Sequence, residues 1–165
     1  IESYVRDRIR VDIKESDPAL SRIQGAFVTL TEDGELRGCI GQIQAALPLY
    51  KSVSDMAIEA ATGDPRFMPV TAKELSKIHI EISVLSPLVK VASAEEIVLG
   101  KHGVIVKKGP RSGVFLPQVA GETGWSKEEF LSYLCAHKAG LPENAWKNKD
   151  TELYVFTAEV FGEDK

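Results

Sequence analysis

The chain has 165 residues, with 20 lysines and arginines against 24 aspartates and glutamates, a formal net charge of −4. This length allows a hydrophobic core that needs no disulfide or metal support, and the 44% hydrophobic content is typical of a globular protein. The acidic balance excludes broad nucleic-acid binding, which requires clustered lysine and arginine. No apolar run approaches the roughly 18 residues that cross a bilayer, and the first residues do not resemble a signal sequence. We therefore expect a soluble, cytoplasmic protein that binds no membrane.

The first predicted elements are a helix and a hairpin. Apolar residues recur at every fourth position from residue 1 to 13, which predicts an amphipathic helix ending before Asp17. Two strands follow, at 25–31 and 36–43, around Asp33-Gly34. An Asp-Gly pair between such strands indicates a tight two-residue turn.

A second helix and a third strand complete the first half. Pro48 stands at a position typical of a helix start, an apolar face follows it, and Gly63 is a typical stop. Thr71 and Glu74 have the spacing of a capping box, which predicts at most a short helix. Residues 78–84 then alternate between apolar and polar, as in a strand with one buried face.

The second half repeats this order of elements. It comprises a short helix opened by Ser93, a hairpin of strands 104–106 and 113–116, a helix from Ser126 to Gly140 and a final strand over 153–161.

This order predicts an α+β fold with an antiparallel, open or barrel-like sheet covered by helices. The repeated order of elements would follow from a duplication into two related α-β-β-α-β halves, 1–88 and 89–165. Alternatively, the repeat is a coincidence, because hairpins and helices are common. Each half is too small to bury its own sheet, so we expect a single domain over residues 1–165 with one shared core.

Blocks along nearly the whole chain resemble the AMME syndrome candidate protein family, whose prokaryotic members are called AmmeMemoRadiSam system protein A. Residues 36–41, Leu-Arg-Gly-Cys-Ile-Gly, look like its hallmark hexapeptide. The resemblance implies an α+β fold of two related halves with a barrel-like or continuous antiparallel sheet. It also implies a pathway shared with a Memo-type protein and a radical SAM protein, and it assigns no catalytic residue. The other matching blocks are 25–30, 64–70, 81–87, 115–119, 124–125, 130–131 and 138–141.

Cys39 in the hexapeptide is the candidate nucleophile. A nearby cation favours the reactive thiolate, and Arg37, two residues away in the same strand, is expected on the same face. Gly38 and Gly41 would let a ligand or a backbone approach closely, so they are candidate substrate-binding positions. Alternatively, Cys39 is a small buried residue and the glycines serve a bulge, because free cysteines are usually buried and inert. The other cysteine, Cys135, is far away in sequence, which indicates two free thiols.

Three charged or titratable residues are candidates to assist Cys39. His79 and Glu81 share the polar face of the strand over 78–84 and form a candidate acid–base pair, or else both simply face water. Arg66, in the proline-bracketed loop 64–69, is a candidate clamp for a carboxylate or phosphate. In the alternative, Phe67 anchors this loop and Arg66 pairs with an acid.

No cofactor is predicted. The glycine-rich signatures for dinucleotides and nucleoside triphosphates are missing, as are metal-ligand spacings and an iron–sulfur cysteine cluster. Lys107, Lys108 and Arg111 at the second hairpin tip, with Lys101 nearby, are a weaker candidate for RNA contact and are more often solvated charges that protect a strand edge.

Two functions remain open. In the first, the protein is an enzyme or enzyme subunit in which Cys39 attacks a small anionic or carbonyl substrate, arginines hold the charge, and His79 with Glu81 moves protons. In the second, it is a non-catalytic protein-interaction or substrate-presenting module of the same system.

Overall fold

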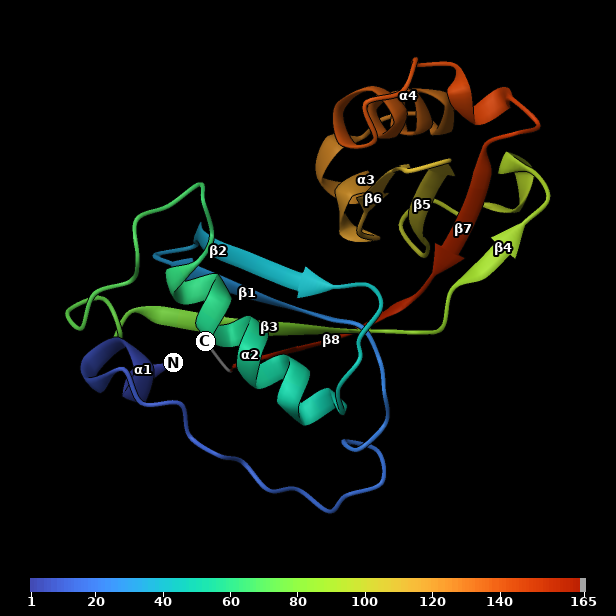
Figure 1. The fold of residues 1–165 in the computed structure, drawn as a ribbon. Helices are drawn as coiled ribbons and strands as arrows, with labels where there is room; N and C mark the ends of the chain where they lie inside the picture. The colour runs from blue at the N-terminus through green and yellow to red at the C-terminus, as the bar shows by residue number, and fades with distance from the viewer. Residues whose placement is uncertain (164–165) are drawn as a thin grey trace. The chain divides into compact units, whose positions relative to one another are not determined.

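A computed structural model describes residues 1–163 (Figure 1). The chain forms two compact units, one of Ile1–Leu85 with the segment from Glu159 onward, the other of Ser86–Ala158. Each unit holds a four-stranded antiparallel sheet. The predicted α+β class and antiparallel pairing are confirmed. The strands do not close into one barrel, because each of the two sheets ends in an edge strand on both sides.

The first unit pairs its strands in the order β2-β1-β3-β8. The predicted hairpin is present, with positive φ angles of 53° at Asp33 and 86° at Gly34, as a two-residue turn of this type requires. The elements of this unit are α1 (Glu2–Asp7), β1 (Ala26–Glu32), β2 (Glu35–Gln42), α2 (Leu49–Thr62), β3 (Ile78–Leu85) and β8 (Ala158–Gly162).

Helix α2 covers one face of this sheet. Val28 and Leu30 of β1 pack against Met56 and Ala60 of α2, and all four are buried. Because side chains alternate along a strand, the residues of β1 next to these, and their partners in β2 and β3, lie on the opposite face. That opposite face carries the threonines of β1 together with His79 of β3, and it is the polar face of the first sheet.

The N-terminal helix is shorter than the sequence predicted. It ends at Asp7, where Arg8 takes a left-handed conformation with φ 60° and ψ 25°. Only Ile1 and Val5 of the apolar pattern pack against the core, whereas Ile9 and Ile13 are exposed. Because most helix stability comes from packing an apolar face, the helix does not continue beyond the residues that have such a partner.

The second unit has its own core. Phe130 and Leu134 pack against Val104 and Val106 of the sheet, whose order is β4-β7-β5-β6. Its elements are β4 (Val89–Val91), η1 (Ala94–Glu96), β5 (Gly103–Lys108), β6 (Arg111–Phe115), α3 (Gln118–Thr123), α4 (Lys127–Tyr133), η2 (Leu134–Lys138), η3 (Ala145–Lys147) and β7 (Glu152–Phe156).

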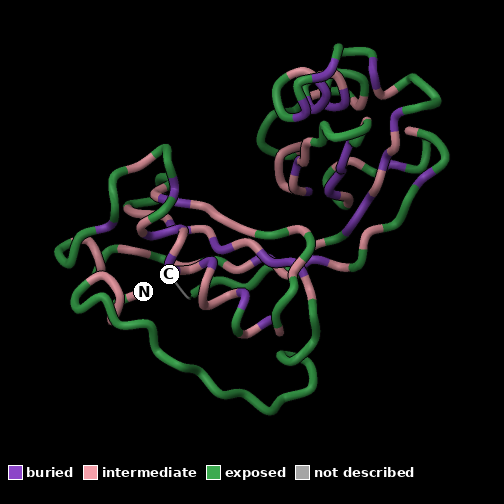
Figure 2. Tube along the Cα trace, viewed as in Figure 1, coloured by how far each residue is buried: buried purple, intermediate pink, exposed green. Residues whose placement is uncertain are grey.

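Buried residues form two clusters, one inside each unit, where the sequence predicted a single shared core (Figure 2). The two sheets have the same connectivity: a hairpin, a third strand beside its first strand, and a fourth strand on the outside. In each sheet that fourth strand follows the third strand of the other unit. The single strand predicted over 153–161 is therefore two strands, β7 and β8, in different sheets.

The predicted capping boxes precede helices at two of three places. Capping boxes are present at Ser93 and Ser126, as predicted. The hydroxyl and backbone N–H of Thr71 both donate to the carboxylate of Glu74, but only turns follow. Strand β4, with three residues, and helix α3, with six, were not predicted because they are too short to show a period.

Candidate functional site

The polar face of the first sheet brings part of the predicted site together. Thr29 of β1 is paired with Cys39 of β2 on one side and with Glu81 of β3 on the other. Paired residues in neighbouring strands share a face, so these three side chains form a row across the sheet. His79 lies in the next row, opposite Thr31.

Cys39 is held by hydrogen bonds on several sides. Its Sγ lies 3.2 Å from the hydroxyl of Thr29. Its backbone N–H donates to Oδ2 of Asp64 at 2.9 Å, and its carbonyl oxygen accepts from Nη2 of Arg66 at 3.3 Å. Both backbone groups point away from β1, and because β2 is an edge strand they meet no other described strand. The loop after α2 therefore takes the place of a neighbouring strand at the hexapeptide.

Asp64 and Arg66 form a two-pronged ion pair. Nε and Nη2 of Arg66 donate to the two carboxylate oxygens of Asp64 at 3.0 and 2.7 Å. The Asp64 side chain is 2% exposed, so its charge depends on these partners. The hydrogen bonds from Arg66, together with the backbone N–H of Cys39, hold the pKa of Asp64 well below its usual range. The same pair raises the pKa of Arg66.

Arg37 is also paired. Its Nε donates to Oε1 of Glu74 at 2.8 Å. This bond and those from Thr71 lower the pKa of Glu74 to about 2. The guanidinium carbons of Arg37 and Arg66 lie 6.0 and 5.5 Å from the centre of the Phe67 ring. Arg66 pairs with an acid, as in the structural alternative for this loop, whereas Phe67 is half-buried between the two arginines and is not part of the first core cluster.

Both glycines of the hexapeptide leave space for other groups of this chain. A Cβ at Gly38 would overlap the carbonyl oxygen of Ala60, so this glycine lets α2 pack closely on β2. A Cβ at Gly41 would overlap the ring of Phe27. The close approach predicted at both positions is present, and in both cases the approaching group belongs to this chain.

His79 and Glu81 are separate from the thiol. Both are exposed and line a depression of about 410 Å³ on the polar face, and Cys39 does not line it. Two strand spacings, about 10 Å, separate Glu81 from Cys39. Within residues 1–163 no carboxylate or imidazole forms a hydrogen bond with the Cys39 thiol. The other lining residues are Thr29, Thr31, Asp33, Gly34, Ile80, Gly162 and Glu163.

The depression is acidic. Three carboxylates line it, from Asp33, Glu81 and Glu163, against the single imidazole of His79. One of them is fixed in place, because Oε2 of Glu163 accepts a hydrogen bond of 2.9 Å from the N–H of Ile80. The site therefore carries negative charge, whereas the nearby arginines of the hexapeptide and its loop are neutralised by their own partners.

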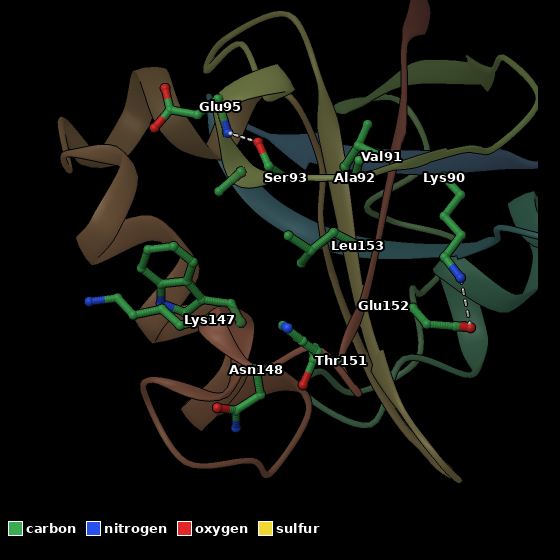
Figure 3. A pocket seen from close by; sticks show the side chains of 13 residues that line it. Lys90, Val91, Ala92, Ser93, Glu95, Lys147, Asn148, Thr151, Glu152 and Leu153 are labelled. Carbon is green, nitrogen blue, oxygen red and sulfur yellow. Dashed lines mark hydrogen bonds and ion pairs between the residues drawn. The ribbon is translucent and has the colours of Figure 1, made fainter.

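A second depression, of about 440 Å³, lies in the second unit beside β4 and β7 (Figure 3). Lys90 and Glu152 form an ion pair of 3.1 Å in its wall. The Thr151 hydroxyl there is buried and has no hydrogen-bond partner among the described residues. None of the predicted site residues lines this depression.

Two of the basic residues at the second hairpin tip bind other groups of this chain. Lys108 pairs with Asp150 at 3.0 Å, and Arg111 donates to the carbonyl oxygen of Gly140 at 2.7 Å. Within the part of the chain that the structure describes, no group of three metal-ligating side chains is close enough to hold an ion. No helix among the same residues has the length and apolarity to cross a bilayer.

Thr29, Asp64 and Glu74 were missed as site residues. Thr29 sits in an ordinary alternating strand, and only the pairing register places its hydroxyl beside the thiol. Asp64 could have been predicted as the partner of Arg66, because it is an acid only two residues away in the sequence.

The fold and the site define an α+β protein of two four-stranded sheets in which a cysteine motif is braced at a sheet edge. Residues 1–161 match the AMMECR1 family, and the chain belongs to this family. Protein MK0488 of Methanopyrus kandleri is 44% identical, over 100% of this chain and 84% of its own. Protein NEQ441 of Nanoarchaeum equitans is 45% identical, over 93% of this chain and 87% of its own. The crystal structure of uncharacterized protein PH0010 from Pyrococcus horikoshii superposes with a TM-score of 0.92 at 40% identity, over 99% of this chain and 86% of that one.

Proposed function

We propose that this protein is a non-catalytic binding module, which presents the polar face of its first sheet to a basic segment of another protein. The observation that carries the proposal is the setting of Cys39. Its thiol lies against the Thr29 hydroxyl, and the nearest residue of the predicted acid–base pair is two strands away. A nucleophilic cysteine needs a base within hydrogen-bond reach or one water of it, so the arrangement favours binding.

Charge favours a basic partner. A lysine or arginine side chain entering the depression would meet three carboxylates, of which Asp33 already has Nζ of Lys77 at 3.9 Å. A small anionic substrate would be repelled there, and neither Arg37 nor Arg66 is free to offset that repulsion, since each is already paired with an acid. The Memo-type and radical SAM proteins implied by the family resemblance are the candidate partners.

An enzyme that uses Cys39 is the second candidate function. It is favoured by the partial exposure of this cysteine, which a purely structural role in the core does not require. The fully buried Cys135 shows the contrast.

The experiment measures the affinity of the purified chain for Memo-type and radical SAM proteins from the same genome by calorimetry. We expect binding that weakens with salt, and Glu81→Lys should reduce affinity at least about tenfold because it reverses a charge in the depression. Glu122→Lys, an exposed acid of α3 in the second unit, is the matched control and should bind like the wild type. An affinity that Glu81→Lys leaves unchanged would contradict the proposal.

A further inference from the structure

Residues 9–14, between α1 and β1, have the pattern of a strand but pair with no strand among the described residues. Residues 9–14 alternate between apolar and charged, Ile-Arg-Val-Asp-Ile-Lys, which is typical of a strand with one buried face. All residues from 6 to 23 are exposed, with Ile9 at 57% and Val11 at 59%. Figure 1 shows the segment as an extended trace. Within residues 1–163, no backbone–backbone hydrogen bond involves residues 10–14.

Strand β8 offers a matching edge. It is the outermost strand of the first sheet, and its outer side pairs with no other described strand. Val160 and Phe161 are 50% and 52% exposed, on opposite faces of the strand. Edges that avoid pairing usually carry lysine, proline or a bulge, and β8 contains neither lysine nor proline.

The charges of the two segments match in one antiparallel register. Arg10 and Lys14 are four residues apart, as are Glu159 and Glu163. When residues 9–14 lie antiparallel to β8 with Lys14 opposite Glu159, Arg10 falls opposite Glu163. A shift by one residue loses both pairs and turns the apolar side chains to the other face.

The same register forms one apolar pair, because it places Ile13 opposite Val160 on the face away from the charges, while Phe161 falls opposite Asp12. A parallel register would satisfy the same charges and would place Val11 opposite Val160 instead. The antiparallel ladder is the more stable per residue, so we adopt it.

We propose that a second copy of this chain supplies the missing partner. Residues 9–14 of one protomer add to β8 of the other, and the reciprocal contact closes a two-fold dimer. A second copy is favoured because both complementary segments belong to this chain, so one symmetric dimer uses both at once. In the single chain Arg10 pairs with Asp55 and Glu59 at 3.0 and 3.5 Å, and all three side chains are more than 40% exposed. Exposed pairs of this kind contribute little, so giving them up costs little. Oε2 of Glu163 accepts from the N–H of Ile80, so Arg10 of the second copy would bind the other oxygen of this carboxylate.

Engineered cysteines test the register. Ile13→Cys combined with Val160→Cys should give a disulfide-linked dimer under mild oxidation, since directly opposed strand residues lie within disulfide range. Asp12→Cys with Val160→Cys places the thiols on opposite faces and should give no more dimer than the unmodified chain, whose own thiols set the background. A dimer formed by Val11→Cys with Val160→Cys, in place of the first pair, would overturn the antiparallel register.

Charge reversal tests the dimer itself, with mass measured by light scattering and folding checked by circular dichroism. The wild type should be dimeric. Arg10→Glu with Lys14→Glu should be monomeric, as should Glu159→Lys with Glu163→Lys, and combining all four changes should restore the dimer. A monomeric wild type, including one whose own segment folds onto its own β8, would overturn the proposal. So would a dimer that neither double variant weakens.

Discussion

The carboxylate of Asp64 accepts a hydrogen bond of 2.9 Å from the backbone N–H of Cys39, a residue 25 positions earlier in the chain. Arg66 donates to the carbonyl oxygen of the same cysteine. The loop after α2 thus satisfies both outward-facing backbone groups at the centre of the hexapeptide, and it protects this part of the β2 edge from pairing with another strand.

Asp64→Ala should destabilise the protein strongly. It leaves the Cys39 N–H and Arg66 without their acceptor. The carboxylate is buried although Arg66 is 54% exposed, and the loss of its hydrogen bonds costs about 2–4 kcal/mol of unfolding free energy. Urea titration followed by circular dichroism measures this loss. Asp55→Ala, which removes an exposed acid paired with Arg10, is the control and should cost less than about 1 kcal/mol. Equal effects of the two substitutions would show that the loop does not brace the hexapeptide.

Stability should fall in acid through Asp64 and Glu74. Both carboxyl groups have a lower pKa in the folded protein than in the unfolded chain, and that of Glu74 falls from 4.5 to about 2. The unfolded state therefore binds protons first, and the stabilisation that is complete above about pH 5 is lost progressively towards about pH 2. Melting temperatures across this range measure the loss. Glu74→Gln should flatten part of the slope, and an unchanged slope would argue against the Arg37–Glu74 pair.

Gly38→Ala should be destabilising by about 1–3 kcal/mol or more, because the new methyl group would overlap the carbonyl oxygen of Ala60 and push α2 off β2. Gly121→Ala is the matched control. Gly121 lies in α3 with open space around its Cβ position, so alanine there should be neutral or stabilising by up to about 1 kcal/mol. Thermal melts of the two variants should move in opposite directions or differ by several degrees, and equal melts would refute the close helix–strand packing.

The two thiols should differ in labelling by iodoacetamide. Cys135 is fully buried and burial raises its pKa, whereas Cys39 is partly exposed. Mass spectrometry of the native protein should find the label on Cys39 first, and both thiols should react in denaturant. Native labelling of Cys135 at the same rate would contradict the packing of the second core.

Local signals explain which parts of the fold could be predicted. The Asp33-Gly34 hairpin and the capping box at Ser126 follow from residues next to one another, and both are present. The exchange of β4 and β8 between the sheets depends on pairings across most of the chain, which no local pattern encodes.

The candidate site shows the same difference between local and long-range information. Cys39, Arg37 and Arg66 were singled out from the hexapeptide and its loop, but their actual partners depend on long-range packing and strand register. The helix predicted through Ile13 ends at Asp7, because Ile9 and Ile13 are exposed and do not pack on the core, and a spacing of four is equally compatible with the alternation of a strand.

The most direct test of the proposed binding function is Cys39→Ser, compared with the wild type for affinity to the Memo-type and radical SAM proteins and for function in the cell. The substitution removes the thiol and keeps a group that can bond to Thr29. A binding module should retain both affinity and cellular function, within about twofold of the wild type. A Cys39→Ser protein that melts like the wild type and binds its partner, yet has lost cellular function, would show that the thiol does chemistry.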